Sequence, residues 1–172
     1  MFEYLKECED KRARGGLQDY IGKYLYNFIV VNGIQTVIET GVSWGFASCY
    51  FLEAVAKTDG TLMSIENRLM AKEQMVVPEE LYSRWGIYER SSKIELPKVI
   101  DSLAQVDLFW HDSDHSYTNQ LFEYRTAKLK ARFIGSHDIH RRDRCAWDTF
   151  KNETEHRLIT EDDQFGLLEV LI

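Results

Sequence analysis

The most informative stretch of this chain reads Thr36-Val37-Ile38-Glu39-Thr40-Gly41-Val42-Ser43-Trp44-Gly45. Branched apolar residues run into an acidic residue, two glycines follow, and a mostly apolar segment of helical length occupies positions 44–57. This order predicts a buried strand, a tight turn and the start of a helix. Such a junction presents backbone N–H groups and a helix N-terminus at one edge of a sheet, which favours an anionic or nucleoside-like ligand.

The rest of the chain alternates short apolar runs with segments of helical period. Strands are expected at 36–40, 61–65, 86–90, 106–111 and 132–136, with a closing antiparallel pair at 156–160 and 167–172. Helices are expected at 17–32, 44–57, before Pro78, at 96–103 with Pro97 in the first turn, at 117–128 and at 143–151, with a short one over 2–14. This alternation predicts an α/β fold, a Rossmann-like, doubly wound and mostly parallel sheet with helices on both faces.

Composition narrows the class of protein. The 172 residues carry no linker-like stretch, so we expect a single domain over 1–172, with an N-terminal helical segment (1–33) packing on it. A net charge of −7 argues against a nucleic-acid partner. No apolar run reaches the roughly 18 residues of a membrane span, and three cysteines without metal-ligand spacing suit a reducing compartment, so we expect a cytoplasmic protein.

Polar residues follow several of the predicted strands at their carboxyl ends. They are Glu39 with Gly41, Glu66, Asp112 with His115, and His137 with Asp138. Because the carboxyl ends of parallel strands meet at one edge, these groups should converge on a single ligand site. Glu66 stands 25 residues beyond Gly41, where a carboxylate can accept both hydroxyls of a ribose, which predicts a nucleoside-containing cofactor.

The turn at 39–45, together with Glu66 and the closing strand pair, resembles the class I S-adenosylmethionine-dependent methyltransferases. Residues 112–117 (Asp112-Ser113-Asp114-His115-Ser116-Tyr117) are similar to the Asp-x-Asp-His-Ser-Tyr signature of a small-molecule subfamily, the methyltransferase domain family 24 type. Residues 135–138 resemble its later His-Asp element, and the resemblance covers roughly residues 30–172. Ser43 departs from the family, since many members have glycine there.

The resemblance implies roles for individual residues. Those it places at S-adenosyl-L-methionine are Glu39, Gly41, Ser43, Trp44, Gly45, Glu66, Asn67, Ser91, Ser92 and Asp112. It implies that His115 is the catalytic base, assisted by Asp112, and that Asp112, Asp138 and His137 hold Mg²⁺. The alternatives are that Asp112 only caps the next helix and that His137 is simply packed at a strand end.

The expected function is S-adenosylmethionine-dependent methyl transfer to a small-molecule acceptor, at a hydroxyl oxygen, with a divalent metal as an optional aid. The alternatives are a non-catalytic nucleotide-binding module and, less favoured, an NAD-dependent oxidoreductase, whose turn needs Gly-x-Gly-x-x-Gly. The chain is short for the family, so a second copy of it could complete the pocket. Arg141, Arg142 and Arg144 suit either an acidic acceptor or a solvated helix start.

Overall fold

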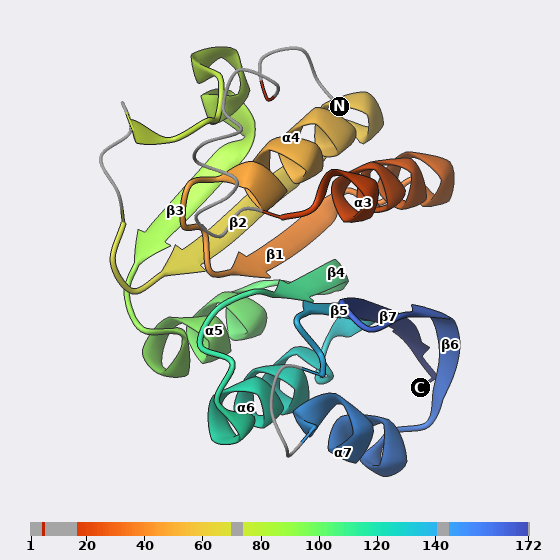
Figure 1. Cartoon of the computed structure of the whole chain (residues 1–172). Coiled ribbons are helices and arrows are strands. Elements are labelled where there is room, and N and C mark those ends of the chain that lie inside the picture. The colour runs from red at the N-terminus through yellow and green to blue at the C-terminus, as the bar shows by residue number, and fades with distance from the viewer. Residues whose placement is uncertain (1–4, 6–16, 70–73, 141–144, 172) are drawn as a thin grey trace.

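The computed structural model describes residues 5, 17–69, 74–140 and 145–171, and within them it contains a seven-stranded sheet (Figure 1). Its strands are β1 (Thr36–Thr40), β2 (Thr61–Glu66), β3 (Trp85–Glu89), β4 (Val106–His111), β5 (Ala131–His137), β6 (His156–Glu161) and β7 (Phe165–Val170). The spatial order is β3-β2-β1-β4-β5-β7-β6; neighbours from β3 to β5 run parallel, and β7 is antiparallel to both β5 and β6. The predicted fold class is confirmed.

Helices cover both faces of this sheet (Figure 1). One face carries α3 (Asp19–Asn32), α4 (Phe46–Thr58) and the 3₁₀ helix η2 (Glu79–Arg84). The other carries α5 (Ser92–Ser102), α6 (Tyr117–Ala127) and α7 (Ala146–Glu153). Each face has its own apolar core, because alternate strand residues point to opposite sides of the sheet. None of the described helices combines the length and the apolar character that crossing a membrane requires.

Two local predictions around proline were wrong. Helix α5 begins at Ser92, so Pro97 lies inside the helix and not in its first turn. The helix starts early because the Ser91 carbonyl accepts from the N–H groups of Ile94 and Glu95 and closes a first turn that the apolar pattern does not mark. After Pro78, where a loop was expected, η2 forms with Pro78 at its N-cap, a place that needs no N–H donor.

Some predictions fall outside the described residues. They are the short helix over 2–14, Cys8, part of the segment before Pro78, and the arginines Arg141, Arg142 and Arg144. The single-domain organisation of residues 1–172 also stays a prediction. Within the described chain, Gly33 ends α3 in the left-handed conformation (φ 61°), as expected for a helix C-terminus.

A close contact between neighbouring strands lies at the centre of the sheet. Trp110 of β4 is fully buried and lies beside Gly135 of β5, its register partner. A Cβ atom added to Gly135 would lie 2.6 Å from the Trp110 ring. The ring also packs edge-on against Phe51 of α4, with 6.0 Å between centroids. It therefore has little freedom to move away.

We predict that Gly135→Ala lowers the free energy of unfolding by about 1–3 kcal/mol, because the added methyl group overpacks a rigid aromatic contact. The matched control is Gly86→Ala in β3, where the nearest atom to an added Cβ is 3.7 Å away, so the change should be below about 0.5 kcal/mol. Urea denaturation of both variants measures the difference. Equal stability of the two variants would contradict this packing argument.

Candidate functional site

The turn between β1 and α4 is built from left-handed backbone conformations. Gly41, Ser43 and Gly45 have φ angles of 86°, 50° and 83°. A Cβ atom on Gly41 would lie 2.1 Å from the carbonyl oxygen of Asp112, so only glycine lets the turn touch the loop after β4. Ser43 adopts the left-handed conformation that glycine reaches without strain, so the turn keeps its shape at this position at a backbone cost that glycine would not carry.

A cleft of about 420 Å³ opens beside this turn, at the carboxyl ends of the central strands. It is lined by Gly41, Ser43, Ile65, Glu66, Asn67, Ser91, Ser92, Lys93, Asp112, Ser113, Asp114 and Asn119. Seven of the ten residues predicted to bind the cofactor are therefore brought together here. Trp44 borders a smaller adjoining hollow, Gly45 approaches Val77, and Glu39 is buried below the turn.

Glu66 orders the turn through its backbone amides. One carboxylate oxygen, Oε2, accepts hydrogen bonds from the N–H groups of Val42 (2.8 Å) and Ser43 (3.3 Å). The other, Oε1, accepts from the N–H of Arg68 at 3.0 Å. Oε2 already uses both of its lone pairs, but Oε1 keeps a second one, so Glu66 can still accept from a ligand hydroxyl in the cleft. The sequence did not predict this structural role.

Glu39 is fully buried with few partners. Its Oε2 accepts from the hydroxyls of Ser48 and Ser64, each at 2.7 Å, and Ser64 in turn accepts from the indole N–H of Trp85. Its Oε1 has no partner among the described residues. Burial without a nearby cation raises the pKa of Glu39 to about 8, so the carboxyl group stays neutral in much of the physiological range.

The predicted carboxylate and imidazole group does assemble at the ends of β4 and β5. Nε2 of His115 lies 3.6 Å from Oδ1 of Asp112 and 3.6 Å from Oδ2 of Asp138. Nδ1 of His137 lies 3.1 Å from Asp112 Oδ1 and 3.8 Å from Asp138 Oδ2. Asp112 therefore faces the two histidines, while Asp114 accepts from the N–H and hydroxyl of Ser116 at the start of α6.

Sequence reasoning missed Glu123, a fully buried acid on α6 beneath the cleft. Its carboxylate gathers hydrogen bonds from Thr40 (2.6 Å) and from Ser113 and Asn119 (2.9 Å each), and it lies 2.6 Å from Nδ1 of His111. The sequence did offer one indication, because Glu123 is an acidic residue on the apolar side of the helix predicted at 117–128. Its partners, however, come from three separate segments that only the folded sheet brings together.

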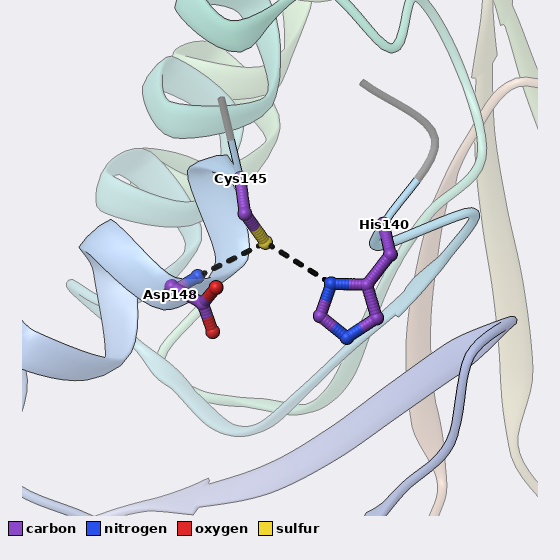
Figure 2. A group of neighbouring side chains, drawn as sticks. All are labelled: His140, Cys145 and Asp148. Atoms are coloured by element: carbon purple, nitrogen blue, oxygen red, sulfur yellow. Dashed lines mark hydrogen bonds between the residues drawn. The ribbon is translucent and has the colours of Figure 1, made fainter. Parts of the chain in front are cut away.

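A second polar group lies at the start of α7, away from the cleft lining (Figure 2). Ligand atoms of His140, Cys145 and Asp148 lie within 4.8 Å of one another, although the sequence showed no metal-ligand spacing around Cys145. The Cys145 thiol caps α7 by accepting from the Asp148 N–H at 3.4 Å, and it donates to the Ile139 carbonyl. The Asp148 carboxylate pairs with Lys151 at 3.1 Å, and Cys145 Sγ also lies 3.7 Å from Nδ1 of His140.

The sequence profile described as "Methyltransferase domain" matches residues 38–139, which is more than half of the chain. The chain belongs to this methyltransferase family. The matched region begins in β1 and ends just after β5, so it includes the turn, the cleft and the carboxylate and imidazole group. The predicted family is confirmed. No curated protein sequence matches the chain.

Solved structures similar to this chain are methyltransferases of low sequence identity. A Podospora anserina methyltransferase bound to SAH has a TM-score of 0.72 and 12% identity, covering 100% of this chain and 89% of its own. An O-methyltransferase from Bacillus cereus in complex with SAH has a TM-score of 0.70 and 12% identity, covering 99% and 92%. A Streptomyces achromogenes O-methyltransferase of tomaymycin synthesis, in complex with SAM, has a TM-score of 0.71 and 12% identity, covering 100% and 91%. These likenesses show the shared fold.

The buried Glu39 predicts a pH-dependent stability. Between its ordinary pKa of 4.5 and the raised value of about 8, the unfolded chain releases the Glu39 proton while the folded protein keeps it. Stability contributed by this group therefore falls as pH rises through that window. Because glutamine is neutral at every pH, Glu39→Gln should gain stability relative to the natural protein by about 1 kcal/mol per pH unit between about pH 5 and about pH 8.

Urea denaturation of both proteins across that pH range measures the gain. Glu89→Gln is the control, since Glu89 is exposed at the end of β3 and should show no such trend. A stability difference between Glu39→Gln and the natural protein that does not change with pH would contradict the assignment of a buried, neutral Glu39.

Proposed function

We propose that this protein transfers a methyl group from S-adenosyl-L-methionine to a small-molecule acceptor, at a hydroxyl oxygen. The observation that carries the proposal is the position of the cleft. In the strand order β3-β2-β1-β4-β5, the connection after β1 runs to β2 on one side of the β1/β4 pair, and the connection after β4 runs to β5 on the other side. The cleft lies at the carboxyl ends of these strands. Open parallel sheets bind nucleoside cofactors at such a switch point.

The residues of the cleft fit the parts of this cofactor. Glu66 offers the remaining lone pair of Oε1 to a ribose hydroxyl, and the close approach of Gly41 keeps the floor of the cleft free of side chains. Asn67, Ser91 and Ser92 border the end of the cleft proposed for the adenine ring. The unpartnered Oε1 of Glu39 suits the amino group of the methionine portion, reached directly or through water.

His115 is proposed as the base for the acceptor. The bound cofactor would supply a methyl group already activated on a sulfonium sulfur, so the protein has to align the acceptor and remove its proton. His115 would take the proton of the acceptor hydroxyl as that oxygen receives the methyl group. Asp112 and Asp138, each 3.6 Å from Nε2, would stabilise the imidazolium that results.

Asp112, Asp138 and His137 would hold a divalent cation such as Mg²⁺ if their side chains drew closer together, because among the described residues the ligand atoms that all lie within 4.8 Å of one another belong to His140, Cys145 and Asp148. Ligand atoms of one small ion lie roughly 3 Å apart, close to the 3.1 Å between His137 Nδ1 and Asp112 Oδ1. Nε2 of His137 faces the amide oxygen of Gln18 at 2.8 Å, so both ring nitrogens face acceptor atoms. A cation bound at Nδ1 would satisfy this arrangement, with Nε2–H donating to Gln18 as an outer partner of the ligand. The ion would orient the acceptor oxygen.

Calorimetric titration with S-adenosylhomocysteine and with NAD, each with and without Mg²⁺, tests the proposal. We expect S-adenosylhomocysteine to bind and NAD to bind at least about a hundredfold more weakly, because the turn lacks the third glycine of the dinucleotide fingerprint. Glu66→Gln should weaken S-adenosylhomocysteine binding about tenfold or more by removing a charged acceptor from the ribose hydroxyls. His115→Ala should bind it normally.

The matched control for Glu66 is Glu89→Gln, a carboxylate at the end of the adjacent strand that does not line the cleft. Thermal denaturation of Glu66→Gln without ligand separates a disturbed turn from a lost ligand contact. If S-adenosylhomocysteine released no heat, the proposed activity would be wrong. If His115→Ala methylated an identified acceptor at the normal rate, the activity would stand and the base would have to be reassigned.

A further inference from the structure

Three side chains with different donor atoms meet where the segment after β5 reaches the start of α7 (Figure 2). The Sγ of Cys145 lies 3.7 Å from Nδ1 of His140, and these two atoms and a carboxylate oxygen of Asp148 all lie within 4.8 Å of one another. None of the three residues lines the cleft at the carboxyl ends of the central strands. The group therefore shares no residue with the site proposed for the cofactor and the acceptor.

The spacing of these atoms is close to that of a zinc site. Zn²⁺ binds sulfur at about 2.3 Å and nitrogen at about 2.0 Å in a tetrahedral arrangement, which puts the two ligand atoms roughly 3.5 Å apart. The 3.7 Å between Cys145 Sγ and His140 Nδ1 is nearly this value. Two of the three ligand atoms are therefore already placed for one ion.

The carboxylate of Asp148 is able to complete the set. Its oxygen lies within 4.8 Å of the other two ligand atoms, so it has to approach them by no more than roughly 1.3 Å. The side chain is about half exposed, which leaves it room to turn. Its ion-pair partner Lys151 also pairs with Glu161 at 2.6 Å and keeps that partner when Asp148 turns away.

The donor set indicates which metal would bind. An imidazole nitrogen, a thiolate sulfur and a carboxylate oxygen suit Zn²⁺, whereas Mg²⁺ takes oxygen ligands. Three protein ligands leave the fourth tetrahedral position to water. The N-terminus of α7 disfavours a nearby cation, but the two anionic ligands balance the charge of the ion, so the helix faces a neutral assembly.

Helix capping alone explains the group less completely. The Sγ of Cys145 accepts from the Asp148 N–H at 3.4 Å, although serine, threonine, aspartate and asparagine are the residues that N-caps favour. Capping also gives no role to His140, an exposed residue whose Nδ1 faces the sulfur. A shared metal ion accounts for all three side chains.

We propose that His140, Cys145 and Asp148 bind Zn²⁺, and that the ion links the segment after β5 to the first turn of α7. On binding, the S–H bond of Cys145 breaks, the sulfur bonds to zinc and the proton leaves to water. Burial raises the pKa of this thiol, so the proton stays on the sulfur until the ion displaces it. The inference does not depend on methyl transfer, since none of the three residues takes part in the proposed reaction.

Titration of the metal-free, reduced protein with Co²⁺ tests the proposal, because Co²⁺ occupies zinc sites and a cobalt–thiolate bond gives a charge-transfer absorption band. The natural protein should develop this band with a single equivalent of Co²⁺. Zn²⁺ should then abolish the band, and an excess of Mg²⁺ of about a hundredfold should leave it unchanged. Zn²⁺ should also raise the midpoint of thermal unfolding, because it binds the folded protein.

Cys145→Ser should lose the band and keep α7 intact, because serine is a better N-cap than cysteine. His140→Ala removes an exposed side chain and should weaken Co²⁺ and Zn²⁺ binding about a hundredfold or more, since even the outer partners of metal ligands commonly contribute 10–100-fold. The matched controls are Cys8→Ser and His156→Ala, which should keep the band and the affinity of the natural protein.

Asp112→Asn separates this site from the cation site proposed for the acceptor, and it should also keep the band. Absence of the band in the natural protein, or a band that survives in Cys145→Ser, would overturn the zinc site. Zinc binding that is lost in Asp112→Asn and unchanged in His140→Ala would overturn it too, because the ion would then lie at the acceptor site. The binding of S-adenosylhomocysteine tests the proposed function separately from all of these results.

Discussion

Gly41 touches the backbone of Asp112 so closely that no side chain would fit between them. This contact continues the pairing of β1 with β4, in which the Asp112 N–H donates to the Thr40 carbonyl at 2.8 Å. It brings the turn after β1 and the loop after β4 to the same edge of the sheet. The two loops that define the cleft are therefore held together by backbone packing, before any of their side chains takes part.

Two glutamates stabilise these loops by accepting hydrogen bonds from them. Glu66, at the end of β2, accepts from the amides of the turn, and Glu123, on α6, accepts from Thr40 at the end of β1 and from Ser113 after β4. The loops therefore do not depend on a ligand for their internal hydrogen bonds. A preformed cleft of this kind lowers the free-energy cost of ordering the site when a ligand binds.

Glu39 and Glu123 lie on opposite faces of one sheet, and their surroundings shift the pKa of the same carboxyl group in opposite directions. Both are fully buried, and the adjacent strand residues Glu39 and Thr40 point to different faces, toward α4 and toward Glu123 respectively. Glu39 meets only serine hydroxyls, so burial dominates and its pKa rises. Glu123 meets an imidazole, which keeps its pKa low. A buried carboxylate needs a partner that can carry positive charge.

Much of the fold could be predicted from the local pattern of apolar and polar residues, but only part of the candidate site could. The strands at 36–40 and 106–111 are marked by apolar residues at their centres (Val37-Ile38 and Leu108-Phe109-Trp110), and the alternation of such strands with helices was enough to predict a parallel sheet and the edge where polar residues meet. The start of α5 was misjudged because polar residues with no apolar period begin it. Glu123 was missed for a different reason: its partner Thr40 is 83 residues away in the sequence.

The central claim is that the cleft beside Gly41 holds the nucleoside of S-adenosylmethionine. The most direct measurement is a crystal structure of the protein with S-adenosylhomocysteine. The account predicts density for the ribose hydroxyls at the carboxylate of Glu66 and for the adenine between Asn67 and the segment Ser91–Ser92. Density for the ligand at any other surface, with the cleft filled by water, would contradict it.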